Sequence, residues 1–75
     1  MDNNKLEKKF IEYFEQEYKW ACQALDRNIA ESWEIVNNAE QRMLGVANFC
    51  QNLGLKYDFI EKIYEDYKHK INFYF

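Results

Sequence analysis

The chain has 75 residues, of which 48% are apolar, 19% aromatic and 31% charged, and its formal net charge is −3. This size supports one helical domain, residues 1–75, near the lower limit for folding on a single core. The acidic balance leaves no basic surface to neutralise phosphates, which disfavours nucleic-acid partners. The polar N-terminal sequence MDNNKLEKKF lacks the apolar run of a signal peptide. Because no segment approaches the roughly 18 consecutive apolar residues of a membrane span, we expect a cytoplasmic protein.

The first helix is predicted to begin at Asn4, because Glu7 follows at the spacing of a capping box. Its apolar stripe covers about half of the helix circumference, which is wider than one neighbouring helix requires. The residues that recur at steps of three and four are Leu6, Phe10, Tyr13, Phe14, Ala21, Ala24 and Leu25. We expect the helix to end in a turn at Asp26–Asn28, since Asn tolerates the left-handed conformation that a helix end requires.

The second helix is predicted to span residues 29–53, with Asn28 and Glu31 at another capping-box spacing. Its apolar stripe begins with Ile29, Trp33 and Val36. A break at Asn37–Asn38 is an alternative, although one long helix is favoured. Gly54 is the strongest stop signal, because glycine supplies the positive φ of a helix end and Leu55 can make the accompanying apolar contact.

The third helix is predicted to begin at Asp58, with Glu61 at the capping-box spacing. Its apolar stripe consists of Ile60, Ile63, Tyr64, Tyr67, Ile71 and Tyr74. The short turns favour an all-α, three-helix, up-down-up bundle, in which a long antiparallel hairpin is joined by a shorter third helix.

The aromatic residues exceed what one small core can easily bury, since each offers roughly 150–250 Å². We therefore expect the surplus to lie in an interface with a second copy, as a homodimer, or with another protein. The aromatic C-terminal tail supports this expectation, because exposed termini are usually polar. The predicted interface residues are Phe10, Tyr13, Phe14, Tyr18, Trp20, Phe73, Tyr74 and Phe75.

Glu17 and Glu40 interrupt apolar stripes and would lie at the same level of an antiparallel hairpin. Two buried carboxylates could form part of a metal site, but these sites usually add a His three residues after a Glu, and no such pair exists here. The simpler interpretation is that each Glu lies at the edge of its stripe. Cys22 and Cys50 lack a metal-binding spacing, and the hairpin places them too far apart for a disulfide.

Catalytic patterns are weak in this sequence. His69 is the only histidine and lies on a charged helix face, and the two arginines fall at the first turn (Arg27) and on a polar face (Arg42). We therefore expect no enzyme activity, cofactor, metal or small-molecule substrate. The segment around Gly54 resembles a helix-turn-helix in its spacing, but its second helix would present mainly acids to DNA. The leading prediction is a small protein–protein interaction or oligomerisation module, and the alternative is a helix-turn-helix-like regulator.

Overall fold

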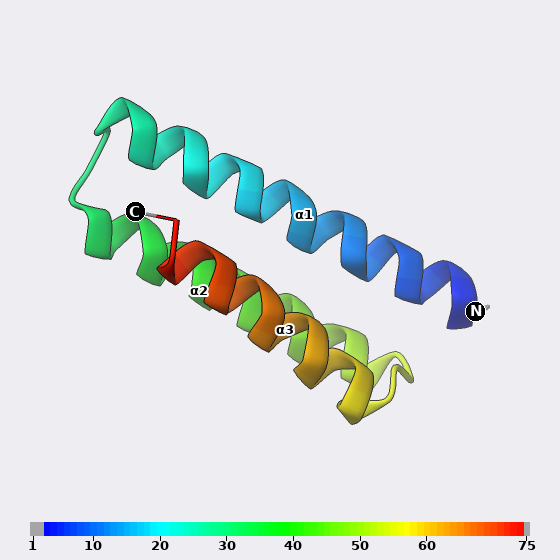
Figure 1. The fold of residues 1–75 in the computed structure, drawn as a ribbon. Coiled ribbons are helices and arrows are strands. Elements are labelled where there is room, and N and C mark those ends of the chain that lie inside the picture. Colours follow the sequence, from blue (N-terminus) through cyan, green and yellow to red (C-terminus); the bar gives the residue numbers. More distant parts are fainter. Residues whose placement is uncertain (1–2, 75) are drawn as a thin grey trace.

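A computed structural model describes residues 3–74 and contains three α-helices. They are α1 (Asn3–Arg27), α2 (Ser32–Asn52) and α3 (Tyr57–Asn72). Each helix runs opposite to the one before it, and α3 returns alongside α2 (Figure 1). All three pairs of helices are in contact. The structure thus confirms an all-α bundle of three helices packed against each other.

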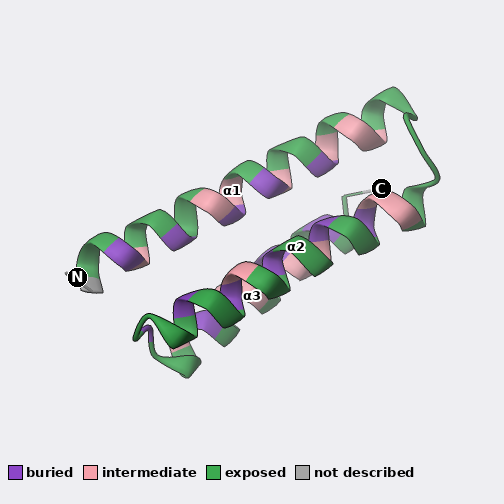
Figure 2. Ribbon diagram, turned by 180° about the vertical axis from the view of Figure 1, so that it is seen from behind, coloured by how far each residue is buried: buried purple, intermediate pink, exposed green. Residues whose placement is uncertain are grey.

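The core lies along the axis between the three helices, where their buried faces converge (Figure 2). Phe10 and Phe14 of α1, Met43 of α2 and Ile71 of α3 are its largest fully buried side chains. Phe10 and Phe14, predicted from the sequence to lie in an interface, thus belong to the core of the single chain. The wide stripe of α1 faces two neighbouring helices, because α1 is in contact with both α2 and α3. The ring of Phe14 contacts those of Tyr64 and Tyr67 of α3.

The first turn ends α1 through Asn28, whose φ of 52° is left-handed as predicted. The backbone N–H groups of Asn28 and Ile29 donate to the carbonyls of Leu25 and Ala24, which is the hydrogen-bond pattern of a Schellman motif. Asn28 therefore ends α1 and does not cap α2. The second helix begins three residues later than predicted, at Ser32, because Ile29 to Glu31 are needed to reverse the chain.

The second turn follows the same hydrogen-bond scheme. Gly54 has a φ of 110°, its N–H donates to Gln51, and the N–H of Leu55 donates to Cys50. Leu55 is buried, so the predicted apolar contact accompanies the motif. The favoured single helix is confirmed, because α2 continues without a break through Asn37–Asn38. The start of α3 differs in detail, at Tyr57, one residue before the predicted start.

The helices differ in length, and this difference positions the candidate site. Because α3 has 16 residues and α2 has 21, α3 is shorter by about 7–8 Å at 1.5 Å per residue. In Figure 1 the end of α3 stops short of the start of α2. The beginning of α2 therefore lacks a covering third helix. Within residues 3–74, no helix combines the length and apolarity needed to cross a membrane.

Candidate functional site: the surface around the first turn

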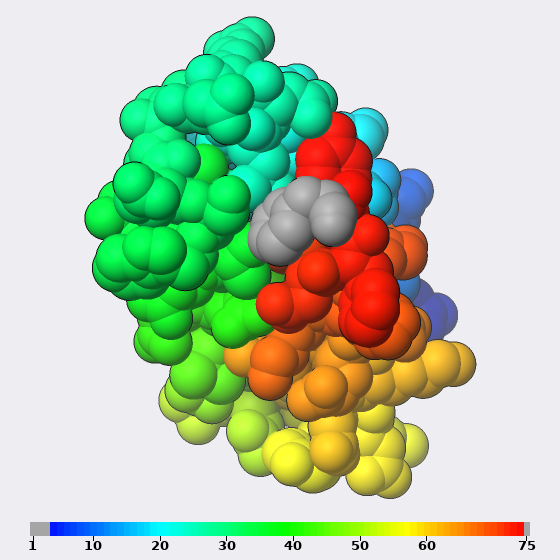
Figure 3. Space-filling model, turned by 60° about the vertical axis from the view of Figure 1, so that its left-hand side comes forward, coloured from blue at the N-terminus to red at the C-terminus, as the bar shows by residue number. Residues whose placement is uncertain are grey.

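Large apolar side chains gather around the first turn although the core is complete without them. Trp20, Ile29, Trp33 and Phe73 are 55%, 68%, 67% and 74% exposed, respectively. They come from the last turns of α1, the connecting loop, the start of α2 and the residue after α3. Figure 3 shows that the loop, the start of α2 and the end of α3 share one face of the molecule. We refer to these four residues together as the turn-end surface.

A groove of about 370 Å³ separates α1 from α2 on one side of the turn-end surface. Trp20, Ile29 and Ile35 supply its apolar walls, and Arg27 and Arg42 supply two guanidinium groups. The remaining lining residues are Ala21, Gln23, Ala24 and Asn38. Among the residues that the structure describes, no Asp or Glu lines this groove, which is therefore cationic on a protein of negative net charge.

Below this groove, Arg42 is held by a buried carboxylate. Its Nε donates to both oxygens of Glu17, at 3.0 and 2.9 Å, and the hydroxyl of Tyr13 donates to Glu17 at 3.1 Å. Glu17 is only 3% exposed, whereas the Arg42 side chain is 48% exposed. The pair thus joins α1 to α2 and presents the rest of the guanidinium to the groove. Burial, reinforced by the negative charge of Glu17, raises the pKa of Tyr13 above its ordinary value.

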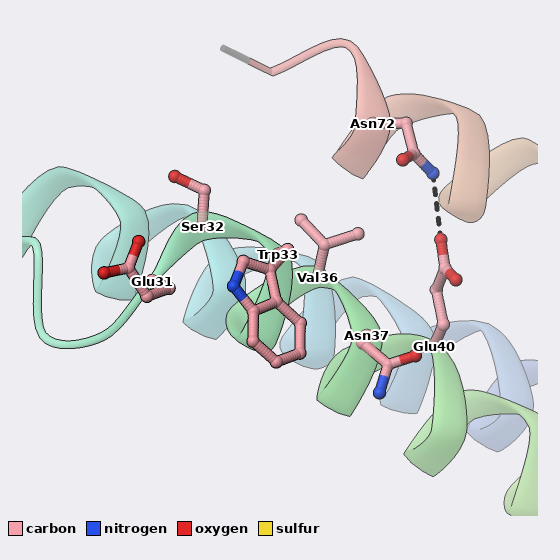
Figure 4. Close-up of a pocket in the computed structure, with 7 residues that line it drawn as sticks. All are labelled: Glu31, Ser32, Trp33, Val36, Asn37, Glu40 and Asn72. Carbon is pink, nitrogen blue, oxygen red and sulfur yellow. Dashed lines mark hydrogen bonds between the residues drawn. The ribbon is translucent and has the colours of Figure 1, made fainter.

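A second hollow, about 700 Å³ and open, lies between the start of α2 and the end of α3 (Figure 4). Trp33 and Val36 give it apolar walls, and Glu31 and Glu40 give it acidic ones. The amide of Asn72 donates to Glu40 at 2.9 Å and joins the two helices across this hollow. The hollow exists because α3 ends before it can cover the first turns of α2. We call it the notch.

Glu17 and Glu40 have different partners. Glu17 is buried and does not lie at the edge of its stripe, and its partner is Arg42, a residue that the helical pattern places on a polar face. Glu40 is only partly buried and bonds Asn72 in an exposed position. Within residues 3–74, no three His, Cys, Asp or Glu side chains are grouped closely enough to hold a metal ion. Both cysteines are free thiols, and burial raises the pKa of each.

The C-terminal residues fold back toward α1. The hydroxyl of Tyr74 donates to both oxygens of Asp26, at 2.7 and 2.9 Å, and this bond is the main reason that its pKa rises to about 12. The ring of Phe73 lies 4.4 Å from that of His69 and remains mostly exposed. Of the predicted tail, Phe75 lies outside the described residues.

The predicted interface residues therefore divide into three groups. Phe10 and Phe14 are core residues, Tyr13 and Tyr18 are partly buried against the core, and Trp20, Phe73 and Tyr74 are exposed. Sequence reasoning missed four members of the site, which are Arg27, Ile29, Trp33 and Arg42. The helical pattern assigns Ile29 and Trp33 to the core stripe of the second helix. The one signal that the start of this stripe would be uncovered was the shorter length predicted for the third helix.

The exposed apolar side chains and paired guanidinium groups are suited to binding. The acids of the notch and the arginines of the groove lie on opposite sides of α2, because the groove is lined from α1 and the notch extends to α3. The chain thus offers two hollows of opposite charge, each with exposed apolar side chains: Trp20 and Ile29 in the groove and Trp33 in the notch. No protein-family model matches this chain, and the searches of curated proteins and of solved structures found no significant match either.

Proposed function

We propose that this protein is a small protein–protein interaction module that binds through the turn-end surface. The observation that carries the proposal is the exposure of Trp20, Ile29, Trp33 and Phe73 by more than half of each side chain. Apolar groups clustered on a monomer mark interaction sites, and aromatic residues are enriched at protein interfaces. The partner is a second copy, in a homodimer, or another protein.

DNA recognition by α2 and α3 has less support. The two helices lie alongside each other (Figure 1), whereas the helices of a helix-turn-helix cross at about 90–120°. Exposed positions of α3 carry Asp58, Glu61, Glu65 and Asp66, which would repel phosphate groups. The interaction module is the better account of both the geometry and the charge.

Site-specific photo-cross-linking tests the proposal. A benzophenone amino acid is placed at Trp33 or Phe73, and the chain is irradiated in the cells that produce it. We expect each position to yield a discrete protein adduct, because both side chains are exposed within the turn-end surface. The control position is Lys62, which is exposed on α3 and lines neither hollow. Adducts no more abundant than those from Lys62 would reject the proposal.

A further inference from the structure

The groove between α1 and α2 contains both arginines of the chain. Arginine is the side chain best suited to recognising carboxylates, because its planar donors can bind both oxygens. The protein as a whole has three more acidic than basic residues, yet no acid lines the described part of this groove. This local reversal of charge indicates that the groove binds an anionic group.

Both guanidinium groups are available to a ligand. Glu17 binds Arg42 through Nε and thereby fixes its orientation, and within residues 3–74 the terminal nitrogens of Arg42 have no protein partner. Arg27 is exposed and likewise forms no ion pair with any described residue. Because Arg42 is held from below, less of its conformational freedom is lost when a carboxylate binds.

The walls of the groove show what else the ligand must carry. Trp20 and Ile29 are exposed, and Ile35 is partly buried between them and the core. Burial of an apolar side chain against these three residues would remove apolar surface from water and favour binding. The volume of about 370 Å³ is near the lower end of typical ligand sites, and suits a few side chains of a larger molecule.

We propose that this groove binds an acidic, amphipathic segment of a partner protein. Carboxylates of the segment pair with Arg27 and Arg42, and an apolar side chain inserts between Trp20, Ile29 and Ile35. This inference rests on the proposed function, since it names the chemistry of a partner that the interaction module recognises.

Three other occupants fit the groove less well. If two copies met groove to groove, four arginines would face one another and repel. Pairing of the groove of one copy with the acidic notch of the other does not fit one twofold interface, because groove and notch lie on opposite sides of α2. Nucleic acid requires many cations to neutralise its phosphates, whereas the groove has two. Anionic membranes attract clusters of roughly 4–8 basic residues.

The test uses a displayed library of random peptides selected on the full 75-residue chain. We expect the selected peptides to be enriched in Asp or Glu next to an apolar residue. Their affinity for the Arg27→Glu variant should be weaker by about tenfold or more, because a charge-assisted hydrogen bond is replaced by repulsion. Arg27→Lys should retain part of the affinity, and Lys62→Glu, which reverses a charge outside the groove, should retain all of it.

Several results would overturn the inference. These are a library that yields no binders, selected peptides without an acidic bias, and acidic peptides that bind Arg27→Glu as tightly as the unmodified chain. Concentration-dependent growth of the solution mass that Arg27→Glu abolishes would assign the groove to a second copy instead. Circular dichroism of Arg27→Glu should match that of the unmodified chain, because the Arg27 side chain is exposed.

The two proposals fail in different ways. Adducts at Trp33 together with a library that shows no acidic bias would reject the acidic segment and keep the interaction module. The opposite result is selection of acidic peptides together with cross-linking no stronger than at Lys62. It would support the groove as a site for acidic ligands and reject the turn-end surface as the contact in cells.

Discussion

Glu17 is a buried carboxylate whose counter-charge comes from a different helix. Arg42 and Tyr13 together supply three hydrogen bonds to its two oxygens. A buried charge without such partners is strongly unfavourable, so Glu17 and Arg42 constrain how α1 and α2 pair. The same contact orients the guanidinium that the groove presents to a ligand, which links the stability of the bundle to its proposed site.

Removal of the Arg42 guanidinium should destabilise the fold, because the buried carboxylate of Glu17 would lose its counter-charge. We expect Arg42→Ala to lower the free energy of unfolding by about 1–3 kcal/mol, because Glu17 then lacks its charged donor. Urea denaturation at neutral pH measures the change. The double variant Glu17→Leu/Arg42→Leu should lose less than Arg42→Ala, since a pair of apolar residues leaves no buried charge. Equal stability of Arg42→Ala and the unmodified chain would contradict this role of the pair.

Tyr67 should make the protein sensitive to alkaline pH. Burial and its hydrogen bond to Glu15 raise the pKa of the phenol from 10.0 to about 12 in the folded state. The folded state therefore favours the protonated phenol, so this contribution to stability is full below pH 10 and is lost as the pH rises to about 12. We expect the free energy of unfolding, measured in urea, to fall across this range.

The Tyr67→Phe variant isolates the phenol from other groups that titrate at high pH. The Lys70 ammonium lies 4.5 Å from the centre of the Tyr67 ring, and phenylalanine keeps that ring while removing the hydroxyl. The decrease in stability at alkaline pH should therefore be smaller in Tyr67→Phe. Tyr57→Phe, at an exposed position, should behave like the unmodified chain. An identical alkaline profile for Tyr67→Phe would disprove the assignment.

At the scale of the helices, both turns depend on one residue with positive φ. Asn28 and Gly54 each end a helix and donate one of the two hydrogen bonds of a Schellman motif, and the residue that follows each donates the other. The next residue along the chain differs between the two turns, since Leu55 is buried whereas Ile29 is exposed and lines the groove. The same backbone device thus closes the core at one end of the bundle and contributes to the candidate site at the other.

The two glycines offer a matched test of this backbone requirement. A Cβ would meet no atom within 4 Å at either Gly54 or Gly45, so contacts cannot explain a difference between them. We expect Gly54→Ala to lose about 1–2 kcal/mol, because its φ of 110° is unfavourable for an L-residue. Gly45→Ala, inside α2, should gain about 0.5–1 kcal/mol from helix propensity. Thermal melts followed by circular dichroism should therefore shift in opposite directions.

At the scale of the whole molecule, the apolar residues of the core are separate from the exposed apolar residues of the turn-end surface. Phe14 is fully buried, and Trp33 is 67% exposed at the end that α3 leaves uncovered. Bundles in which three helices have equal length would cover both positions. The shorter α3 is therefore the feature that turns part of an ordinary apolar stripe into an accessible surface.

Substitution of these two residues should separate stability from association. We expect Trp33→Ser to change the free energy of unfolding by no more than about 0.5 kcal/mol, as is usual at the surface. Phe14→Ala should cost about 3–5 kcal/mol, because it opens a cavity in the core. Light scattering of both the unmodified chain and Trp33→Ser at micromolar concentrations then gives the solution mass. A dimer that Trp33→Ser dissociates identifies a second copy as the partner, and a monomer rejects the homodimer.

The sequence by itself determined the three helices and both turns, because helical periodicity and the preferences of Asn28 and Gly54 act over a few residues. It also singled out Glu17 as a carboxylate that interrupts an apolar stripe. Only the tertiary structure decided that Arg42 neutralises this carboxylate, since a contact between two helices depends on how they are aligned. The tertiary structure likewise decided which apolar residues are covered: Phe14 lies where α3 packs, and Trp33 lies beyond its end. Burial is a property of neighbouring elements, so one helix's own pattern could not distinguish these two residues.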